Sequence, residues 1–208
     1  MKKVFAVVAL LVMTVSVVFA GSVYLDSGVS FTKGNSTLKS EGSELVKLDD
    51  FSVLSLPLEV GYRQTFGNGV VVSGSAGVFF NLNEKINGSS SGNEKFFPTQ
   101  FSFKAQAGYG LKINEKLSAE FLGGLSYAFG KKSNDYISLT FNTFSIVGEA
   151  GIKYNVASSI ILRAGAKMSI PFTTFGKVKI TPVNFSGDFK ASGFVFNITP
   201  FVGVAYQF

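Results

Sequence analysis

The chain has 208 residues, of which 46% are hydrophobic and 15% are charged, and its formal net charge is +6 at pH 7. It contains no cysteine, no histidine and no tryptophan. These absences exclude a disulfide framework, a zinc site of cysteine and histidine ligands, and any hydrolytic centre that needs a histidine. The length predicts one domain. Glycine and phenylalanine, 23 residues each, are more typical of sheets than of helices.

The first 20 residues have the organisation of a secretory signal peptide. Two lysines precede an uncharged run at residues 4–18 that is too short to span a bilayer, which takes roughly 20 residues. Val18-Phe19-Ala20 then carries small residues at the two positions that a signal peptidase reads. We expect cleavage between Ala20 and Gly21 and export of residues 21–208, whose net charge falls to +4 without the two lysines. The alternative is an uncleaved N-terminal anchor.

Apolar and polar residues alternate after residue 20, which is the pattern of β-strands. Eight strands are predicted, at residues 22–32, 51–64, 70–82, 99–113, 117–129, 140–154, 160–170 and 193–208. The connections alternate between long polar loops, at 33–50, 83–98, 130–139 and 171–192, and short turns, at 65–69, 114–116 and 155–159. This alternation predicts an up-and-down meander with both ends on the side of the short turns. A membrane-embedded hairpin within 33–50 or 171–192 would raise the count to ten strands.

The two faces of these strands differ sharply. One face is apolar and uncharged, with aromatic residues near the long loops (Phe31, Phe80, Phe103, Phe129, Phe144 and Phe194) and near the short turns (Tyr62, Tyr154, Tyr206 and Phe208). The other face is rich in glycine and serine. Its charged residues are Asp26, Glu59, Arg63, Lys104, Lys112, Glu120, Glu149, Lys153, Arg163 and Lys167.

Alternation by itself leaves open which face is inside. In a soluble, lipocalin-like barrel the apolar face would point inward, whereas in an outer-membrane barrel it would point towards lipid. The glycine and serine residues beside long charged side chains suit a crowded interior. The two aromatic girdles around an aliphatic band also favour the membrane interpretation.

The last strand carries alternating Val202, Val204 and Tyr206 and a terminal Phe208. This pattern resembles the C-terminal signature that the barrel-assembly machinery recognises in bacterial outer-membrane proteins, with Val204, Tyr206 and Phe208 as the assembly signal. The whole of residues 21–208 resembles the small OmpX, OmpA and OmpW-type barrels. The resemblance implies an all-β fold, an eight-stranded antiparallel up-and-down transmembrane β-barrel, located in the cell outer membrane with outer-membrane lipid and the assembly machinery as partners.

The ten charged residues are predicted to pair inside the barrel, since a buried unpaired charge is costly. Strand register would bring Lys112 near Glu120, and Glu149 near Arg163 and Lys167. The main hypothesis is a closed, non-enzymatic barrel with an envelope-structural role, or with a surface-interaction role through its long loops. Enzymes of the class that the chain resembles use a histidine, which is missing here. We expect no cofactor, metal or nucleic-acid partner.

Two other functions stay open at this stage. One is a narrow OmpW-like channel or porin for small or apolar solutes, which would need a continuous lumen. The other is a soluble lipocalin-like ligand-binding barrel, which would need its apolar face inside.

Overall fold

The computed structural model describes residues 21–40, 43–90, 96–133, 137–181 and 185–208. All regular elements within these ranges are β-strands, and none of the described residues forms a helix that is long and apolar enough to cross a membrane. The predicted signal peptide and its Ala20 lie outside the described residues. The eleven strands are β1 (Ser22–Gly28), β2 (Ser30–Ser40), β3 (Ser43–Thr65), β4 (Val70–Ile86), β5 (Ser89–Ser90), β6 (Gln100–Lys112), β7 (Leu117–Ser133), β8 (Ile137–Asn155), β9 (Ile160–Ile180), β10 (Phe185–Ser192) and β11 (Val195–Gln207).

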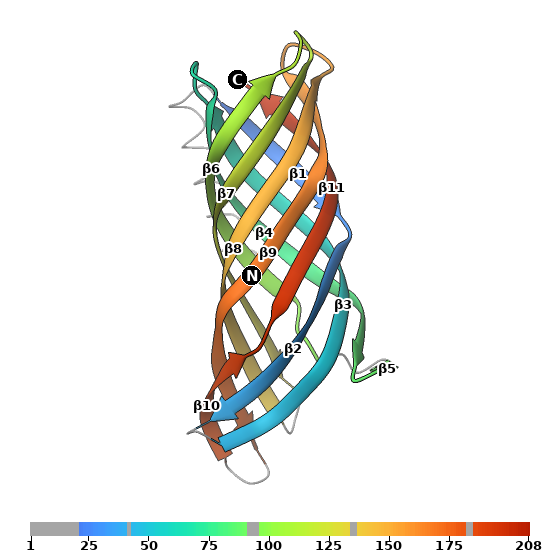
Figure 1. Ribbon diagram of the computed structural model, residues 1–208, viewed down its shortest axis with the longest axis vertical. Helices are drawn as coiled ribbons and strands as arrows, with labels where there is room; N and C mark the ends of the chain where they lie inside the picture. The colour runs from blue at the N-terminus through green and yellow to red at the C-terminus, as the bar shows by residue number, and fades with distance from the viewer. Residues whose placement is uncertain (1–20, 41–42, 91–95, 134–136, 182–184) are drawn as a thin grey trace.

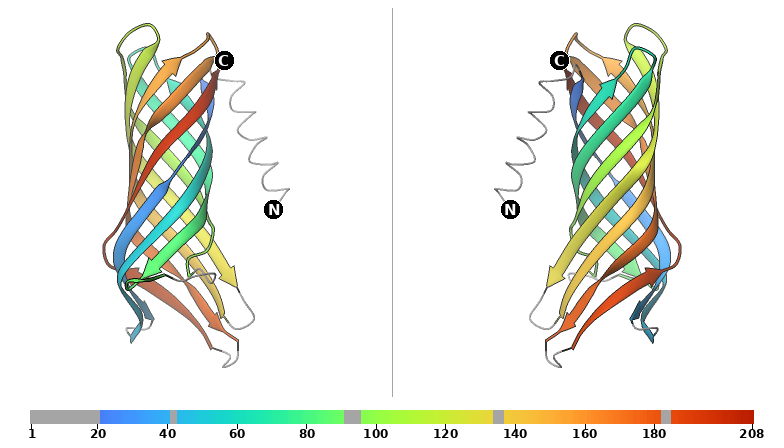
Figure 2. Two further views of the ribbon diagram at one scale, coloured as in Figure 1. Left: turned by 90° about the vertical axis from the view of Figure 1, so that its right-hand side faces the viewer. Right: turned by 90° about the vertical axis from the view of Figure 1, so that its left-hand side faces the viewer.

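The strands form one antiparallel sheet that closes on itself. Strands consecutive in the chain pair from β3 through β4, β6, β7, β8 and β9 to β11, and β1 then pairs with both β11 and β3. The ladder between the ends of the chain runs from Ser22 opposite Gln207 to Gly28 opposite Phe201. The result is a cylinder of tilted strands (Figure 1, Figure 2). Closure removes the two free edges that an open sheet would have along the body of the cylinder.

The two ends of the cylinder differ. Gly21 and Phe208 meet at one end, where the backbone N–H of Phe208 donates to the carbonyl of Gly21 at 3.0 Å. The short turns after β3, β6 and β8 lie at this same end, which we call the turn end. The β2–β3 and β9–β10 strand pairs project at the opposite end, together with the adjoining ends of β7 and β8, and we call this the hairpin end (Figure 2).

The structure divides the chain into eleven strands where the sequence predicted eight. Val29 interrupts the first predicted strand, and Gly193, with φ of 144°, lies in the break of the chain between β10 and β11. The predicted loops at 33–50 and 171–192 are largely strand, because backbone pairing continues after the side chains become polar. Water solvates the polar side chains there, while the ladder still satisfies the backbone.

The apolar face of the sheet points outward. Ile146, Leu125 and Val202 on this face are 59%, 58% and 66% exposed, while Asp26, Arg63 and Glu120 on the other face are 1–2% exposed. This arrangement inverts that of a soluble globular protein and is the opposite of what a soluble lipocalin-like carrier needs. Tyr62, from the predicted girdles, is half-buried. The other girdle residues are exposed: Phe31, Phe80, Phe103, Phe129, Phe144, Phe194, Tyr154, Tyr206 and Phe208.

Candidate functional site: the charged interior

Nine charged residues of the sequence prediction lie inside the cylinder, on six strands. Asp26 lies on β1, Glu59 and Arg63 on β3, Lys104 on β6, Glu120 on β7, Glu149 and Lys153 on β8, and Arg163 and Lys167 on β9. On three of these strands the two charged residues are four positions apart, and residues an even number of positions apart share one face of a strand. Because of this alternation, all nine charged side chains point into the lumen. They form the network described below, which we call the lumen network.

Two arginines share one glutamate across the lumen. Arg63 Nη2 on β3 and Arg163 Nη2 on β9 both donate to Oε1 of Glu149, at 2.9 and 2.8 Å. Arg63 also pairs with Glu120, and Arg163 Nη1 donates to both oxygens of Asp26 at 2.8 Å. The chain of ion pairs thus connects strands that are not neighbours in the sheet and ties opposite walls of the cylinder together.

Two lysines balance a pair of adjacent carboxylates. Asp26 and Glu59 stand opposite each other in the β1–β3 ladder, so their negative charges would repel if left alone. Lys167 Nζ donates to Asp26 Oδ2 at 2.7 Å and to Glu59 Oε1 at 3.0 Å, and Lys104 also pairs with Glu59. Lys153 completes the network by pairing with Glu120. Five cations therefore face four carboxylates, so the buried charge is nearly balanced.

Tyr24 is a member of this cluster that the sequence reasoning missed. Its ring lies beneath the guanidinium of Arg163, 4.2 Å from ring centroid to Cζ, and its hydroxyl is 3.3 Å from Glu59 Oε1 and 3.2 Å from Ser73 Oγ. The signal was present, because Tyr24 lies two positions before Asp26 and so shares its inward face. A cation over an aromatic face gains further stabilisation when water is excluded.

Small residues make room for the network. A Cβ on Gly203 would collide with Oδ1 of Asp26, and a Cβ on Gly61 would lie 2.5 Å from the Tyr24 hydroxyl. Glycine at these two positions allows long side chains from neighbouring strands to lie against the wall. This is the packing reason for the glycines on the charged face.

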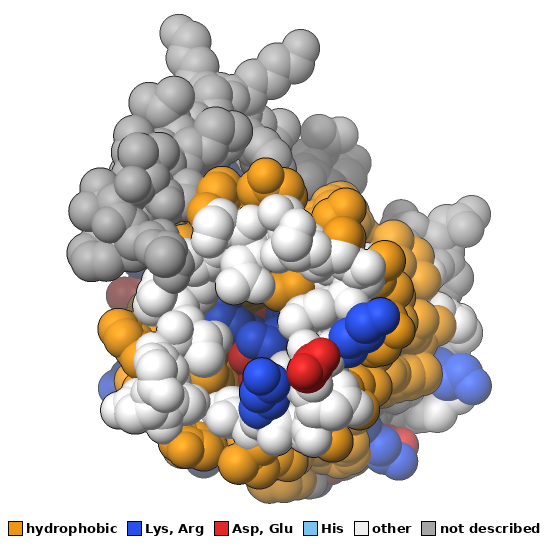
Figure 3. Space-filling view, turned by 90° about the horizontal axis from the view of Figure 1, so that it is seen from above, with side chains coloured by type: hydrophobic (Ala, Val, Ile, Leu, Met, Phe, Trp, Pro, Cys, Tyr) orange, Lys and Arg blue, Asp and Glu red, His pale blue; other side chains and the backbone are white. Residues whose placement is uncertain are grey.

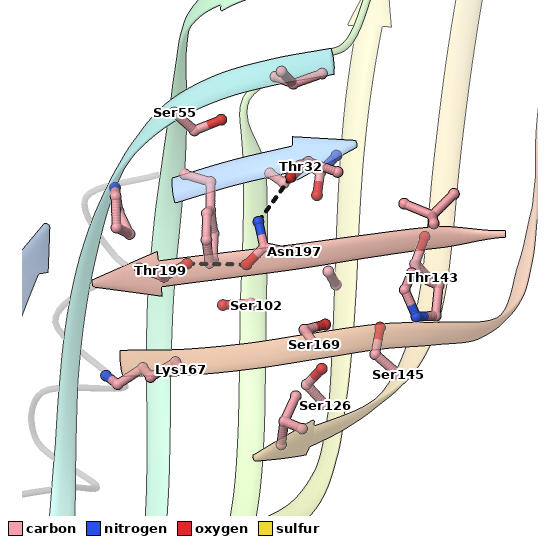
Figure 4. A pocket seen from close by; sticks show the side chains of 18 of the residues that line it. Thr32, Ser55, Ser102, Ser126, Thr143, Ser145, Lys167, Ser169, Asn197 and Thr199 are labelled. Atoms are coloured by element: carbon pink, nitrogen blue, oxygen red, sulfur yellow. Dashed lines mark hydrogen bonds between the residues drawn. The ribbon is translucent and has the colours of Figure 1, made fainter. Parts of the chain in front are cut away.

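A cavity of about 190 Å³ lies on the hairpin side of the lumen network. Lys167, Lys104 and Glu59 contribute to its lining, and hydroxyl and amide side chains form much of the wall. Figure 4 labels Asn197 and Thr199 on β11 among the lining residues; the Asn197 amide donates to the Thr32 hydroxyl at 2.7 Å and accepts from Thr199 at 2.9 Å. Seen from the turn end, charged side chains lie within a central hollow (Figure 3).

Aromatic side chains border the cavity towards the hairpin end. Phe97 lies 5.2 Å from Phe51 and 5.1 Å from Phe96 between ring centroids, and Phe141 lies 5.6 Å from Phe189. Leu38 and Leu48 are buried beside these rings. The interior therefore changes along its axis from charged, through hydroxyl-rich, to apolar.

Glu84 anchors the chain beside this aromatic group and was also missed. Its carboxylate accepts from the backbone N–H of Phe96 and, at 3.0 Å, from that of Phe97. The sequence placed Glu84 in a polar loop. A register shift opposite Leu54 and Ser55 gives β4 one extra residue, which turns Glu84 from the outer face to the lumen.

Nine of the ten predicted lumen charges meet in the network, and Lys112 does not. Lys112 is exposed near the turn end, and Glu120, its predicted partner, pairs with Arg63 and Lys153 instead. Glu149 stands opposite Lys167 in register, but Lys167 donates to Asp26 and Glu59. Reasoning from neighbouring strands alone overlooks contacts across the lumen, which long side chains reach.

The residues of the predicted assembly signal lie on the outer face of the last strand. Val204, Tyr206 and Phe208 are 45%, 54% and 57% exposed, and the rings of the two aromatic residues meet edge to face at 5.3 Å. Gly21, at the predicted cleavage site, is buried against the ring of Tyr62.

No protein-family model and no curated protein matches this sequence. Solved structures are similar to it over nearly the whole chain. OprG of Pseudomonas aeruginosa, an outer membrane protein, has 14% identity and a TM-score of 0.56, covering 91% of this chain and 97% of its own. The outer membrane protein AlkL, determined in lipid bilayers, has 18% identity and a TM-score of 0.55, covering 91% and 90%. Neisserial surface protein A has 15% identity and a TM-score of 0.51, covering 90% and 99%.

At such identities the likeness establishes the fold and leaves the function open. The chain has the fold of the small bacterial outer-membrane β-barrel proteins.

Proposed function

We propose that residues 21–208 form an eight-stranded up-and-down transmembrane β-barrel of the outer membrane, with both termini in the periplasm, and that residues 1–20 are a cleaved signal peptide. In this count β1 and β2 together form one interrupted strand of the barrel, and so do β10 and β11. The two-residue strand β5 pairs only with β4 among the described strands and is not counted. The outward apolar face supports this placement, since a charge at mid-bilayer costs about 2–4 kcal/mol. Outer-membrane lipid is then the surrounding partner, and Val204, Tyr206 and Phe208 are the signal for the assembly machinery.

The barrel is non-enzymatic and does not conduct, and it acts as an envelope-structural or surface-interaction protein through its hairpin end. The observation that carries this proposal is the Arg63–Glu149–Arg163 link, which ties β3 to β8 and β9 across the lumen. An eight-stranded barrel has an interior just wide enough for side chains. Ion pairs of this kind therefore fill the cross-section at their level.

A second candidate is a narrow channel for small or apolar solutes. The cavity of about 190 Å³ and its apolar border favour it, because they leave only the lumen network between the cavity and the turn end. In this alternative the network acts as a gate rather than as a plug.

Conductance of residues 21–208 in a planar lipid bilayer separates the two candidates. If the lumen network closes the barrel, the natural sequence should show no discrete steps in current. The triple variant Glu149→Gln, Arg163→Gln, Lys167→Gln should then show new steps. The control Lys112→Gln changes the net charge equally at an exposed site and should leave the barrel closed. A change in gel mobility on heating checks that each variant is folded.

Steps in the natural sequence would overturn the plug and favour the channel. If the triple variant does not fold, the single variant Lys167→Met takes its place. Current steps in a folded Lys167→Met protein would again support closure by the lumen network. A folded Lys167→Met protein without current steps would show that Lys167 is not needed for closure.

A further inference from the structure

Five lysines lie on one outward face near the hairpin end. Thr140 on β8 stands opposite both Lys131 on β7 and Lys177 on β9. Residues directly opposite in an antiparallel ladder point to the same side of the sheet. Lys179, two positions further along β9, points to that side too. Lys190 of β10 stands opposite Phe175 of β9 and opposite Lys39 of β2, so these two lysines also point outward. The members of this lysine face are Lys39, Lys131, Lys177, Lys179 and Lys190, all of them exposed.

The opposite side of the same strands is fixed towards the lumen. Phe141 of β8, Phe189 of β10 and Leu38 of β2 are buried together in one apolar cluster. Each alternates with outward residues along its strand, so the lysines cannot turn inward without exposing this cluster.

Little acidic charge balances the lysine face. Asp188 is 3.7 Å from Lys177, with both side chains more than three-quarters exposed, where an ion pair contributes little. Among the described residues the other four lysines have no carboxylate within 4.0 Å. Lys39 stands opposite Lys190 in one ladder and opposite Glu44 in the other. Like charges directly opposite in a ladder destabilise it. Lys33 and Lys47 at the same end each have an aspartate of β3 within 4.0 Å, although Lys47, opposite Thr37, also points to the outer side of the sheet.

Aromatic side chains on the same face place the lysines relative to lipid. Phe175 stands opposite Lys190 in register and packs against Phe144, 6.4 Å between centroids. Aromatic belts mark the interface of a membrane barrel. Lys177 and Lys179 follow Phe175 by two and four residues, roughly 7 and 14 Å along the strand at about 3.4 Å per residue. These lysines therefore lie beyond the aromatic belt, on the side where the headgroup layer of that leaflet would be.

We propose that the lysine face binds the phosphate groups of anionic lipids in that leaflet. The proposal rests on the transmembrane placement above and names the partner of one side of the barrel. Lipid phosphates would neutralise the uncompensated charge and relieve the repulsion between Lys39 and Lys190. A flexible ammonium group suits this role, because it follows mobile phosphates without needing a fixed geometry.

The test measures lipid selectivity with the natural residues 21–208 in vesicles. Spin-labelled phosphatidylglycerol and spin-labelled phosphatidylcholine report the fraction of each lipid held at the protein surface. We expect the natural protein to prefer phosphatidylglycerol severalfold, with the preference falling as salt is raised. Lys179→Gln with Lys190→Gln should bring the ratio close to one. The matched control is Lys33→Gln with Lys47→Gln, which removes the same charge at the same end and should keep the preference.

Each other outcome contradicts the proposal in a distinct way. An inserted, folded barrel with no preference overturns the lipid site and leaves the transmembrane placement intact. Equal loss in the control would mean that net charge, and not the lysine face, sets the preference. Equal competition by soluble glycerol phosphate at matched ionic strength would assign the face to free phosphates. Failure of the natural protein to insert into vesicles would instead contradict the proposed function itself.

Discussion

Glu149 is the residue on which most of the interior depends. A single oxygen accepts from two arginines on different strands, and the carboxylate is buried. A buried ion pair contributes modestly as a whole, but removal of one partner leaves the other charged, dehydrated and uncompensated. Removing Glu149 should therefore cost more stability than the intact ion pairs contribute, which is not the case for an exposed carboxylate.

Glu149→Ala is expected to lower the free energy of unfolding by about 3–5 kcal/mol, since two arginines lose a shared acceptor. Urea unfolding of the refolded protein in lipid vesicles measures this value. Glu44→Ala, at an exposed carboxylate of β3, is the control and should stay within about 0.5 kcal/mol of the natural protein. Adding Arg63→Ala to Glu149→Ala should recover part of the loss, because it removes one of the two buried cations that Glu149 no longer balances. Equal effects of Glu149→Ala and Glu44→Ala would contradict the shared-acceptor account.

Among the elements, β4 is the strand whose irregularity matters most for the interior. Its extra residue opposite Leu54 and Ser55 exchanges the two faces of the strand beyond that point. Asn81 before the shift and Glu84 after it both point inward and are buried, although they are three positions apart. The shift thereby places a carboxylate where it can hold the backbone of Phe96 and Phe97 beside the cavity.

Glu84→Ala should loosen the segment around Phe96 and leave the barrel assembled, because the ladder does not depend on this carboxylate. Limited chymotrypsin digestion in micelles, read by mass spectrometry, should detect cleavage after Phe96 several times faster than in the natural protein. Glu44→Ala again serves as the control. Unchanged cleavage at this site would mean that the aromatic packing alone holds the segment.

For the whole molecule, the decisive property is that the apolar face surrounds the cylinder and the charges lie within. In water an exposed isoleucine can be replaced by lysine at little cost, whereas in a bilayer the same replacement is expensive at mid-depth. The medium around the barrel therefore determines how much such a substitution changes the free energy of unfolding.

Ile146→Lys, at an outward position of β8, should lower the free energy of unfolding by about 2–4 kcal/mol when the protein is refolded in vesicles. Leu45→Lys makes a similar change on the projecting β2–β3 hairpin, where the side chain is 42% exposed and should meet water. This control should change stability by less than about 0.5 kcal/mol. Equal costs at the two positions would contradict the transmembrane placement.

The sequence by itself determined which residues share a face, because a strand has a strict period of two. Asp26, Glu59 and Arg163 were assigned to one common face from alternation alone, and the structure brings them together. It also indicated the meander and the turn end, since short polar breaks allow only adjacent antiparallel strands. Strand ends were less predictable, because backbone pairing continued into the polar segments after Phe31 and Ile170.

Only the tertiary structure decided which face is inside and which charges touch. Alternation describes both faces of a strand equally well. Which face lines the lumen depends on the direction in which the sheet curves when it closes. Glu149 meets Arg63 across the lumen from a strand that is not its neighbour, a contact that no local register contains. Lys112 was left outside because it lies near the rim, and Glu84 was turned inward by one extra residue in β4. Periodicity is a local property, whereas closure, reach across the lumen and a shift in register depend on the whole sheet.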